Sequence, residues 1–237
     1  MDFFKKRYIF FGIFCIGFLG SFLFFFYQKP KNLEIPRENV LREGEENENV
    51  EEKVKKDISL EEKLQEKQGV EFVSPLDNPR ERIHKKHFGL YVDPKNSPVF
   101  PERFSGYHTG VDFEIFPGEE NENIEVRALC SGEIFSLKTV NGYGGAIFQK
   151  CLYKERSIMI LYGHIERKSI RFFLGDKVEV GSVLGFLGEG GTEETDGERK
   201  HLHLGIVKGN KENVLGYVSS EELLDQWIDP CELFCSL

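Results

Sequence analysis

The chain has 237 residues, which is enough for one or two domains. Its 31 Lys and Arg against 40 Asp and Glu give a formal net charge of −9, which argues against a nucleic-acid binder because such a protein needs a basic face to neutralise phosphates. A hydrophobic share of 40% with 24 Gly is typical of a folded domain and argues against disorder along the whole chain.

The first predicted element is an apolar segment at residues 8–27, which has no charged side chain and is about as long as a helix that crosses a bilayer. Lys5, Lys6 and Arg7 precede it, so the amino terminus is predicted to be cytoplasmic and the rest of the chain extracytoplasmic. Two lysines after the segment weaken this orientation. A cleaved signal peptide is the alternative, but residues 24–30 lack an Ala-x-Ala cleavage pattern. The sequence therefore favours a single-pass cell-membrane protein, with a cytoplasmic stub and transmembrane anchor at residues 1–28.

Residues 29–71 are predicted to be a charged linker, partly helical or disordered. Residues 41–49 have the composition of a disordered segment. Within 50–68, Ser59 followed by Glu62 has the spacing of a helix capping box. The apolar positions there do not sustain a heptad, so a coiled coil has little support. We expect a solvated spacer that holds a domain away from the membrane.

Residues 72–237 form the predicted domain, in which short β-branched runs alternate with Gly and Asn-Gly turns and no long amphipathic helix intervenes. The pattern predicts an all-β fold, a compact antiparallel β-sandwich or open barrel. One helix is expected at 220–227, with Ser219 and Glu222 at capping-box spacing and Asp229-Pro230 ending it. The predicted strands are 124–129, 132–139, 146–149, 157–162, 177–180, 183–187 and 201–207.

Four of the five cysteines lie in the predicted extracytoplasmic part, where they could pair. They are Cys130, Cys151, Cys231 and Cys235. The C-x3-C spacing of the last two is weak support for a metal site. Buried thiols and one disulfide remain equal alternatives.

The sequence His201-Leu202-His203 places two imidazoles on one face of a predicted strand, because residues two apart in a strand point the same way. Leu202 then points to the opposite face, towards the core. Two imidazoles on one face need polar partners, so one can bind a metal while the other stands beside the metal's open position.

His108 and Asp112 would lie about 13 Å apart on a straight strand, too far to share one ion. A bend at Thr109-Gly110, where glycine allows the turn, would place His108 on a loop and Asp112 on the following strand, so that the two converge. With one histidine of the 201–203 pair they would give two nitrogens and one oxygen, which with a water is the ligand pattern of catalytic zinc. Zinc would lower the pKa of that water to about 7.

The two remaining histidines of this group, one of the 201–203 pair and His164, would then serve as a general base and as a hydrogen-bond donor to a developing oxyanion. His84 and His87 are surrounded by charge and are predicted to be surface residues.

These motifs together resemble the LytM-type, or lysostaphin-like, zinc metallopeptidases, which cut the peptides of bacterial cell walls. The resemblance rests on His-x-Gly-x-Asp at 108–112, Tyr-x-His at 162–164 and His-Leu-His at 201–203, in that order, with a Gly-Tyr-Gly turn at 142–144. It implies that His108, Asp112 and His203 bind one zinc ion per domain, and that His164 and His201 are the catalytic pair. It also implies a lysostaphin-like peptidase fold with a groove across the metal.

Two segments depart from the family pattern. Residues 188–200 are longer and more acidic than the usual loop before His-Leu-His, and 91–105 form a long loop ahead of His108. Both could border the groove or inhibit the site. Glu193, Glu194 and Asp196 are expected to be solvated loop charges and not ligands.

The predicted function is a membrane-anchored zinc endopeptidase that hydrolyses peptide cross-links or stem peptides of peptidoglycan through a zinc-activated water. The alternatives are a non-catalytic regulator or binder of wall hydrolases, which the intact site residues argue against, and a peptidase acting on proteins. The expected partners are peptidoglycan peptides and the membrane, with no nucleic acid. The scissile bond and the oligomeric state stay open.

Overall fold

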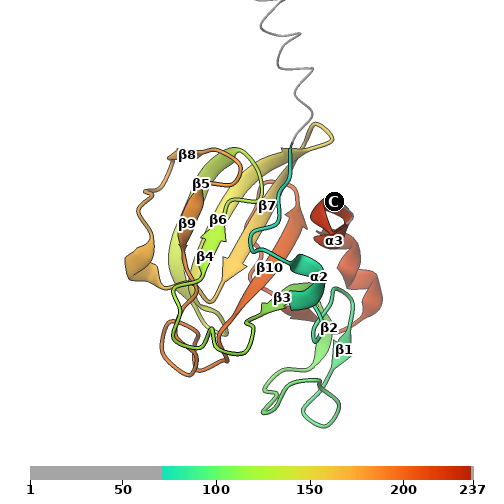
Figure 1. Ribbon diagram of the computed structural model, residues 1–237. Coiled ribbons are helices and arrows are strands. Elements are labelled where there is room, and N and C mark those ends of the chain that lie inside the picture. Colours follow the sequence, from blue (N-terminus) through green and yellow to red (C-terminus); the bar gives the residue numbers. More distant parts are fainter. Residues whose placement is uncertain (1–70, 236–237) are drawn as a thin grey trace, which may run out of the picture. The chain divides into compact units, whose positions relative to one another are not determined.

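The computed structural model describes residues 71–235 (Figure 1), all of which fall in one unit of the chain, Asp57–Leu237. The predicted membrane segment at 8–27 and all but the last residue of the predicted linker at 29–71 lie outside the described residues, so both stay predictions. Within 71–235, no helix is long and apolar enough to cross a membrane.

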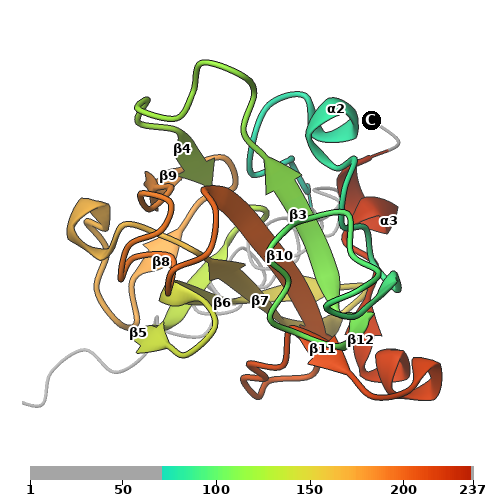
Figure 2. The same cartoon turned by 90° about the horizontal axis from the view of Figure 1, so that it is seen from below.

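A seven-stranded antiparallel sheet forms the centre of the described domain, in the order β12-β10-β7-β6-β5-β8, and β3 also pairs with β10. Strands β3 and β12 share one edge of β10, and β7 pairs along its other edge (Figure 2). The strands are β3 (Gly110–Glu114), β5 (Gly132–Val140), β6 (Gly144–Tyr153), β7 (Arg156–Gly163), β8 (Lys177–Val178), β10 (His201–Lys208) and β12 (Trp227–Ile228).

Short turns set this order. The Asn141-Gly142 turn joins β5 to β6, as expected. Lys154 and Glu155 join β6 to β7, and both have positive φ angles, 47° and 62°, as a two-residue hairpin with the right twist requires.

Two small antiparallel sheets flank the main sheet. One is β1-β2-β11, in which β2 ends at the candidate ligand His108, and the other is the pair β4-β9. Their strands are β1 (Tyr91–Val92), β2 (Gly106–His108), β11 (Tyr217–Val218), β4 (Glu125–Arg127) and β9 (Val183–Phe186).

Helices are short throughout residues 71–235. They are α2 (Pro79–Arg82), α3 (Cys231–Phe234), and the 3-10 turns η1 (Arg167–Ser169) and η2 (Glu221–Gln226). The α-helix predicted at 220–227 is wrong: η2 is a 3-10 helix without a side-chain cap, and Trp227 begins β12. Pairing of Trp227 with Val207 on β10 draws it out of the helix.

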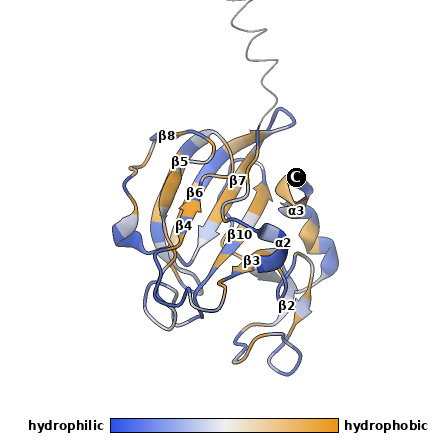
Figure 3. Cartoon of the chain, in the orientation of Figure 1, coloured by the Kyte–Doolittle hydropathy of each residue, from blue (hydrophilic) through white to orange (hydrophobic). Residues whose placement is uncertain are grey.

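The core lies on both faces of the main sheet. The larger cluster takes one set of alternating residues from β7 and β10, including Tyr162, Leu202 and Leu204, and the β4-β9 pair adds Val126 and Leu184. The second cluster takes the opposite face, with Phe148, Met159 and Trp227 among its members. Figure 3 shows the apolar colour concentrated in the central strands. The all-β prediction is confirmed, and each of the seven predicted strands overlaps an observed one.

Two disulfides join the four described cysteines, where the sequence left buried thiols and one disulfide open. Cys130 meets Cys151 on β6, with Cα atoms 6.5 Å apart. Cys231 begins α3 and Cys235 follows its last residue, a spacing of four that brings the two side chains to one side of the helical turn, and their Cα atoms are 4.6 Å apart.

Candidate metal centre and active site

The register of β10 assembles the site. His203 lies directly opposite Asp112 on β3 and opposite Gly163 at the end of β7. His201, two residues earlier, lies opposite Glu114. Leu202 is buried on the opposite face in the larger core cluster, as the alternation predicted.

A bend at Thr109 turns the chain from β2 into β3 and brings His108 beside Asp112. The bend is anchored because the Thr109 hydroxyl donates to the carbonyl of Leu215, 2.6 Å away. Gly110 is required there, since a Cβ atom would lie 2.3 Å from the Leu204 carbonyl oxygen and 2.9 Å from His203 Nε2. The prediction of convergence is confirmed, but His108 lies on strand β2 and not on a loop, because it pairs with Tyr217 of β11.

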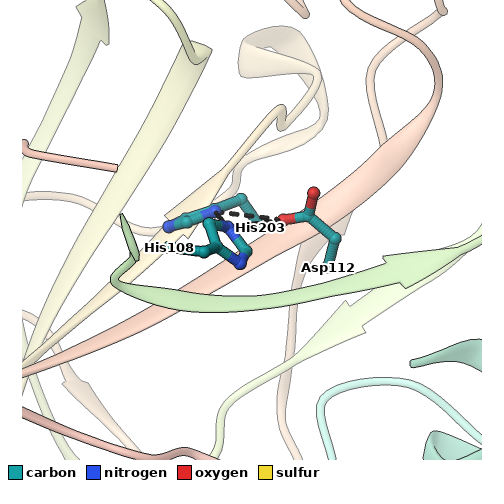
Figure 4. A group of neighbouring side chains, drawn as sticks. All are labelled: His108, Asp112 and His203. Atoms are coloured by element: carbon teal, nitrogen blue, oxygen red, sulfur yellow. Dashed lines mark hydrogen bonds and ion pairs between the residues drawn. The ribbon is translucent and has the colours of Figure 1, made fainter. Parts of the chain in front are cut away.

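Three side chains place one ligand atom each around a common point (Figure 4). His108 Nε2 lies 3.1 Å from His203 Nδ1 and 3.3 Å from Asp112 Oδ1, and His203 Nδ1 lies 3.1 Å from Asp112 Oδ1. Ligands about 2.0–2.1 Å from a tetrahedral zinc ion are roughly 3.3 Å from one another, so these spacings fit that ion.

Hydrogen bonds on the far side of each ring support the same interpretation. His108 Nδ1 faces the carbonyl oxygen of His87 at 3.2 Å, and a carbonyl can only accept, so the proton is on Nδ1 and Nε2 keeps its lone pair. His203 Nε2 lies 3.3 Å from the Tyr143 hydroxyl oxygen, which can accept a hydrogen bond from Nε2–H, so that Nδ1 keeps its lone pair. Two bare nitrogens 3.1 Å apart beside a carboxylate are a set of donors suited to a cation.

The other two predicted histidines lie next to this group. The ring of His164 is 4.2 Å from the ring of His201, measured between centroids. His201 Nδ1 donates to the Arg199 carbonyl at 2.8 Å, which leaves Nε2 as the basic nitrogen, 3.4 Å from Asp112 Oδ2. His164 has a φ of 64°, a left-handed conformation in which strain is expected. Its Nδ1 is buried and has no hydrogen-bond partner among residues 71–235.

A pocket of about 290 Å³ opens onto the site. Asp112, His164, His201 and His203 line it. All five site residues predicted from the sequence are therefore brought together, four of them lining the pocket and His108 against His203.

Burial and neighbouring charge set the protonation states. Burial would raise the pKa of Asp112, but His108 and His201 outweigh it and hold that pKa well below its usual value. Burial lowers the pKa of His203 to about 4, and burial followed by the nearby His201 lowers the pKa of His164 well below its usual value. At neutral pH Asp112 is thus an ionised carboxylate, and the imidazoles of His203 and His164 are neutral.

Sequence reasoning missed two charged residues at this site. Arg199 donates to Asp112 Oδ2 at 2.9 Å and also pairs with Glu114. Glu114 could have been found from the sequence, because it shares the face of Asp112 at a spacing of two on β3. Arg199 precedes β10, and its contact with Asp112 follows only from the assembled sheet.

A buried ion pair beside the pocket was also missed. Lys86 Nζ lies 2.5 Å from Glu102 Oε2 and 2.8 Å from the Tyr217 hydroxyl. No sequence spacing links positions 86 and 102, so only the fold reveals it.

The surface prediction for His84 and His87 is confirmed, since both side chains are exposed. The two loops that depart from the family pattern, residues 91–105 and 188–200, contact each other, because Arg103 Nε lies 2.7 Å from Glu198 Oε1. Asp196 is half-buried and accepts a hydrogen bond from the Gly142 amide at 2.9 Å, so the expectation of a purely solvated loop charge is wrong for this residue.

Residues 106–214 match the profile of Peptidase family M23. Endolysin 2638A of Staphylococcus phage 2638A is 29% identical over 134 residues, which are 52% of this chain and 26% of the endolysin. The chain thus spans about a quarter of that relative's length.

Two solved structures are similar to this chain at low identity. LytU is 20% identical with a TM-score of 0.41, over 62% of this chain and 87% of LytU. The cbpa structure from L. salivarius REN is 20% identical with a TM-score of 0.45, over 70% of this chain and 95% of that chain.

Proposed function

Because residues 106–214 of this chain match Peptidase family M23, we propose that the protein is a zinc endopeptidase that hydrolyses peptide cross-links or stem peptides of bacterial peptidoglycan. The observation that carries the proposal is the set of three ligand atoms 3.1–3.3 Å apart, with His164 and His201 beside them in the pocket. A non-catalytic regulator would not need this set.

His108, Asp112 and His203 would hold the zinc ion. When bound, zinc supplies a Lewis acid that polarises the scissile carbonyl and lowers the pKa of a water ligand. Asp112 is ionised and His203 neutral at pH 7, as metal binding requires.

His201 and His164 have separate roles in the proposed reaction. His201 Nε2 is the free basic nitrogen and accepts the proton of the attacking water, while its Nδ1–H is held by the Arg199 carbonyl. His164 is neutral and donates a hydrogen bond to the oxygen of the scissile carbonyl as charge develops there. Its backbone amide, which donates to the Tyr143 carbonyl at 3.1 Å, fixes the residue in position.

Membrane anchoring belongs to the same proposal. The apolar segment at 8–27, with basic residues before it, supports a single-pass anchor that presents the peptidase domain outside the cytoplasm. A domain tethered in this way would meet peptidoglycan close to the membrane.

The test uses the full chain in detergent, loaded with zinc and incubated with purified peptidoglycan, with released fragments identified by mass spectrometry. We expect new fragments that disappear with a chelator and that name the bond cut. His203→Ala should abolish zinc binding and cleavage, and His201→Ala should stop cleavage while zinc stays bound.

His87→Ala is the matched control, because that side chain is exposed and only its backbone carbonyl contacts the site. It should cleave like the unmodified protein. Cleavage retained by His203→Ala would refute the site assignment. A zinc-loaded protein that releases no fragment from several wall types would refute the peptidoglycan substrate and favour a protein substrate or a regulator.

A further inference from the structure

The carboxylate of Asp112 is divided between two sets of partners. Its Oδ1 atom faces the two ring nitrogens, His203 Nδ1 at 3.1 Å and His108 Nε2 at 3.3 Å. Its Oδ2 atom accepts a hydrogen bond from Arg199 Nη2 at 2.9 Å. The two oxygens of one buried carboxylate therefore serve different purposes.

Arg199 is itself held in place by a second carboxylate. Its Nε atom lies 3.0 Å from Glu114 Oε2, and its Nη2 atom also bonds Glu114 Oε1. Glu114 is 4% exposed and lies on β3 opposite His201, so the guanidinium is fixed from the sheet. Planar guanidinium groups suit such two-point contacts, which a lysine ammonium does not reproduce.

We propose that Arg199 is a positioning residue of the metal centre. It holds Asp112 Oδ2, so that Oδ1 alone faces the metal position. It also occupies the oxygen nearest to His201 Nε2, which lies 3.4 Å from Oδ2, and so leaves that nitrogen free for the reaction. This inference rests on the proposed function of the site.

Removal of Arg199 would free Oδ2 to rotate towards the ring nitrogens or towards His201. The metal would then meet both oxygens of the carboxylate, and the basic nitrogen would acquire a partner. Substitution of a residue that hydrogen-bonds to a metal ligand typically lowers metal affinity or activity by about 10–100-fold.

Lys85 provides a matched control. Its Nζ atom pairs with Glu114 Oε2 at 3.2 Å, so it shares the supporting carboxylate with Arg199, but it makes no contact with Asp112. A loss caused only by an unbalanced Glu114 would appear in Lys85→Met as well as in Arg199→Met. A loss of metal affinity or cleavage that depends on the Arg199 contact with Asp112 would appear only in Arg199→Met.

The experiment uses the full chain in detergent, with Co²⁺ as the metal because its visible absorption reports the number of ligands. In Arg199→Met we expect weaker visible bands, as for a metal with more than four ligands, and a 10–100-fold change in Co²⁺ affinity measured by chelator competition. Peptidoglycan cleavage by the zinc-loaded variant should fall by a similar factor in kcat. Lys85→Met should match the unmodified protein within about twofold, and Arg199→Lys should be intermediate, since the charge remains but the two-point contact is lost.

An Arg199→Met spectrum and affinity equal to those of the unmodified protein would overturn the inference while leaving the proposed function intact. Equal losses in Arg199→Met and Lys85→Met would also overturn it. If the unmodified protein binds Co²⁺ no better than His203→Ala, the proposed metal site itself fails. Should Arg199→Met not fold, as judged by circular dichroism, Arg199→Gln replaces it, because an amide keeps a donor near Oδ2 without the charge. A Gln spectrum and affinity like those of the unmodified protein would then refute the need for the guanidinium.

Discussion

Removal of the Lys86 ammonium should destabilise the domain strongly. Lys86 is 3% exposed, and its Nζ atom lies 2.5 Å from Glu102 Oε2. Lys86→Met keeps most of the apolar stem but leaves the Glu102 carboxylate buried without a cation. Removal of one partner from a buried ion pair costs about 3–5 kcal/mol.

Two neutral hydrogen-bond donors to Glu102 remain in Lys86→Met, so we expect a destabilisation at the lower end of that range. The Ser97 hydroxyl lies 2.8 Å from Oε2, and the Phe104 amide lies 3.0 Å from Oε1. We therefore expect a loss of about 3 kcal/mol in the free energy of unfolding, or roughly 6–12 °C in Tm at 2–4 °C per kcal/mol.

The assay is urea unfolding followed by tryptophan fluorescence, on metal-free protein between pH 3 and pH 8. Burial would raise the pKa of Glu102, but Lys86, Phe104 and Ser97 hold it below its usual value. The ionised Glu102 carboxylate therefore contributes to the free energy of unfolding of the unmodified protein above about pH 4.5, and this contribution is lost as the pH falls below that value. In Lys86→Met the carboxyl can protonate, so the difference between the two proteins should be largest near pH 7 and shrink below pH 4.5.

A surface pair serves as the control. Lys177 Nζ lies 2.7 Å from Glu133 Oε2, but the lysine side chain is 78% exposed, and such pairs contribute at most about 1 kcal/mol. Lys177→Met should therefore change little. A cost of less than 1 kcal/mol for Lys86→Met, or a cost independent of pH, would refute the reasoning.

Three further predictions follow from the site and its supports. Tyr143→Phe removes the hydroxyl 3.3 Å from His203 Nε2 and should weaken zinc affinity about 10-fold in chelator competition, with Tm little changed; an unchanged affinity would exclude that role. Gly163→Ala would place a Cβ atom 2.5 Å from Tyr143 Cδ1 and should cost about 1–3 kcal/mol in urea unfolding, whereas an unchanged midpoint would contradict the packing. Paired Cys130→Ser and Cys151→Ser substitutions open a loop with a sequence separation of 21 and should cost about 3 kcal/mol; equal stability with and without reductant in the unmodified protein would argue against the bond.

The central strands could be predicted from the sequence because they depend on local alternation, and each overlaps an observed strand. The five candidate site residues came from the motifs and the family resemblance; the structure brings them together, and their roles stay predictions. The period of two in His201-Leu202-His203 predicts which side chains point to the core, and Leu202 is fully buried as expected. The bend between His108 and Asp112 follows from the need to bring two ligands four residues apart to one ion.

What the sequence did not reveal depends on pairing between distant segments. The ion pair of Lys86 with Glu102 and the contact of Arg199 with Asp112 arise only once the sheets are assembled. The Lys154-Glu155 turn was invisible because neither residue type favours positive φ, and the long strands on either side impose it. The capping-box spacing predicts an α-helix where residues Glu221–Gln226 form a 3-10 helix, because pairing of Trp227 with β10 overrides local propensity.

The strand that carries His201 and His203 has hydrogen-bonded neighbours along both edges, whereas His108 belongs to the small sheet β1-β2-β11. Amides in the middle of a large sheet exchange with solvent slowly, and those of short peripheral strands exchange first. A metal ion held by both would join the most protected part of the domain to one of its least protected parts. We therefore expect loss of the ion to speed amide exchange around Tyr107 and Tyr217 while the exchange rates of the β10 amides stay unchanged. The exchange rates of the small sheet would then report metal occupancy of the site.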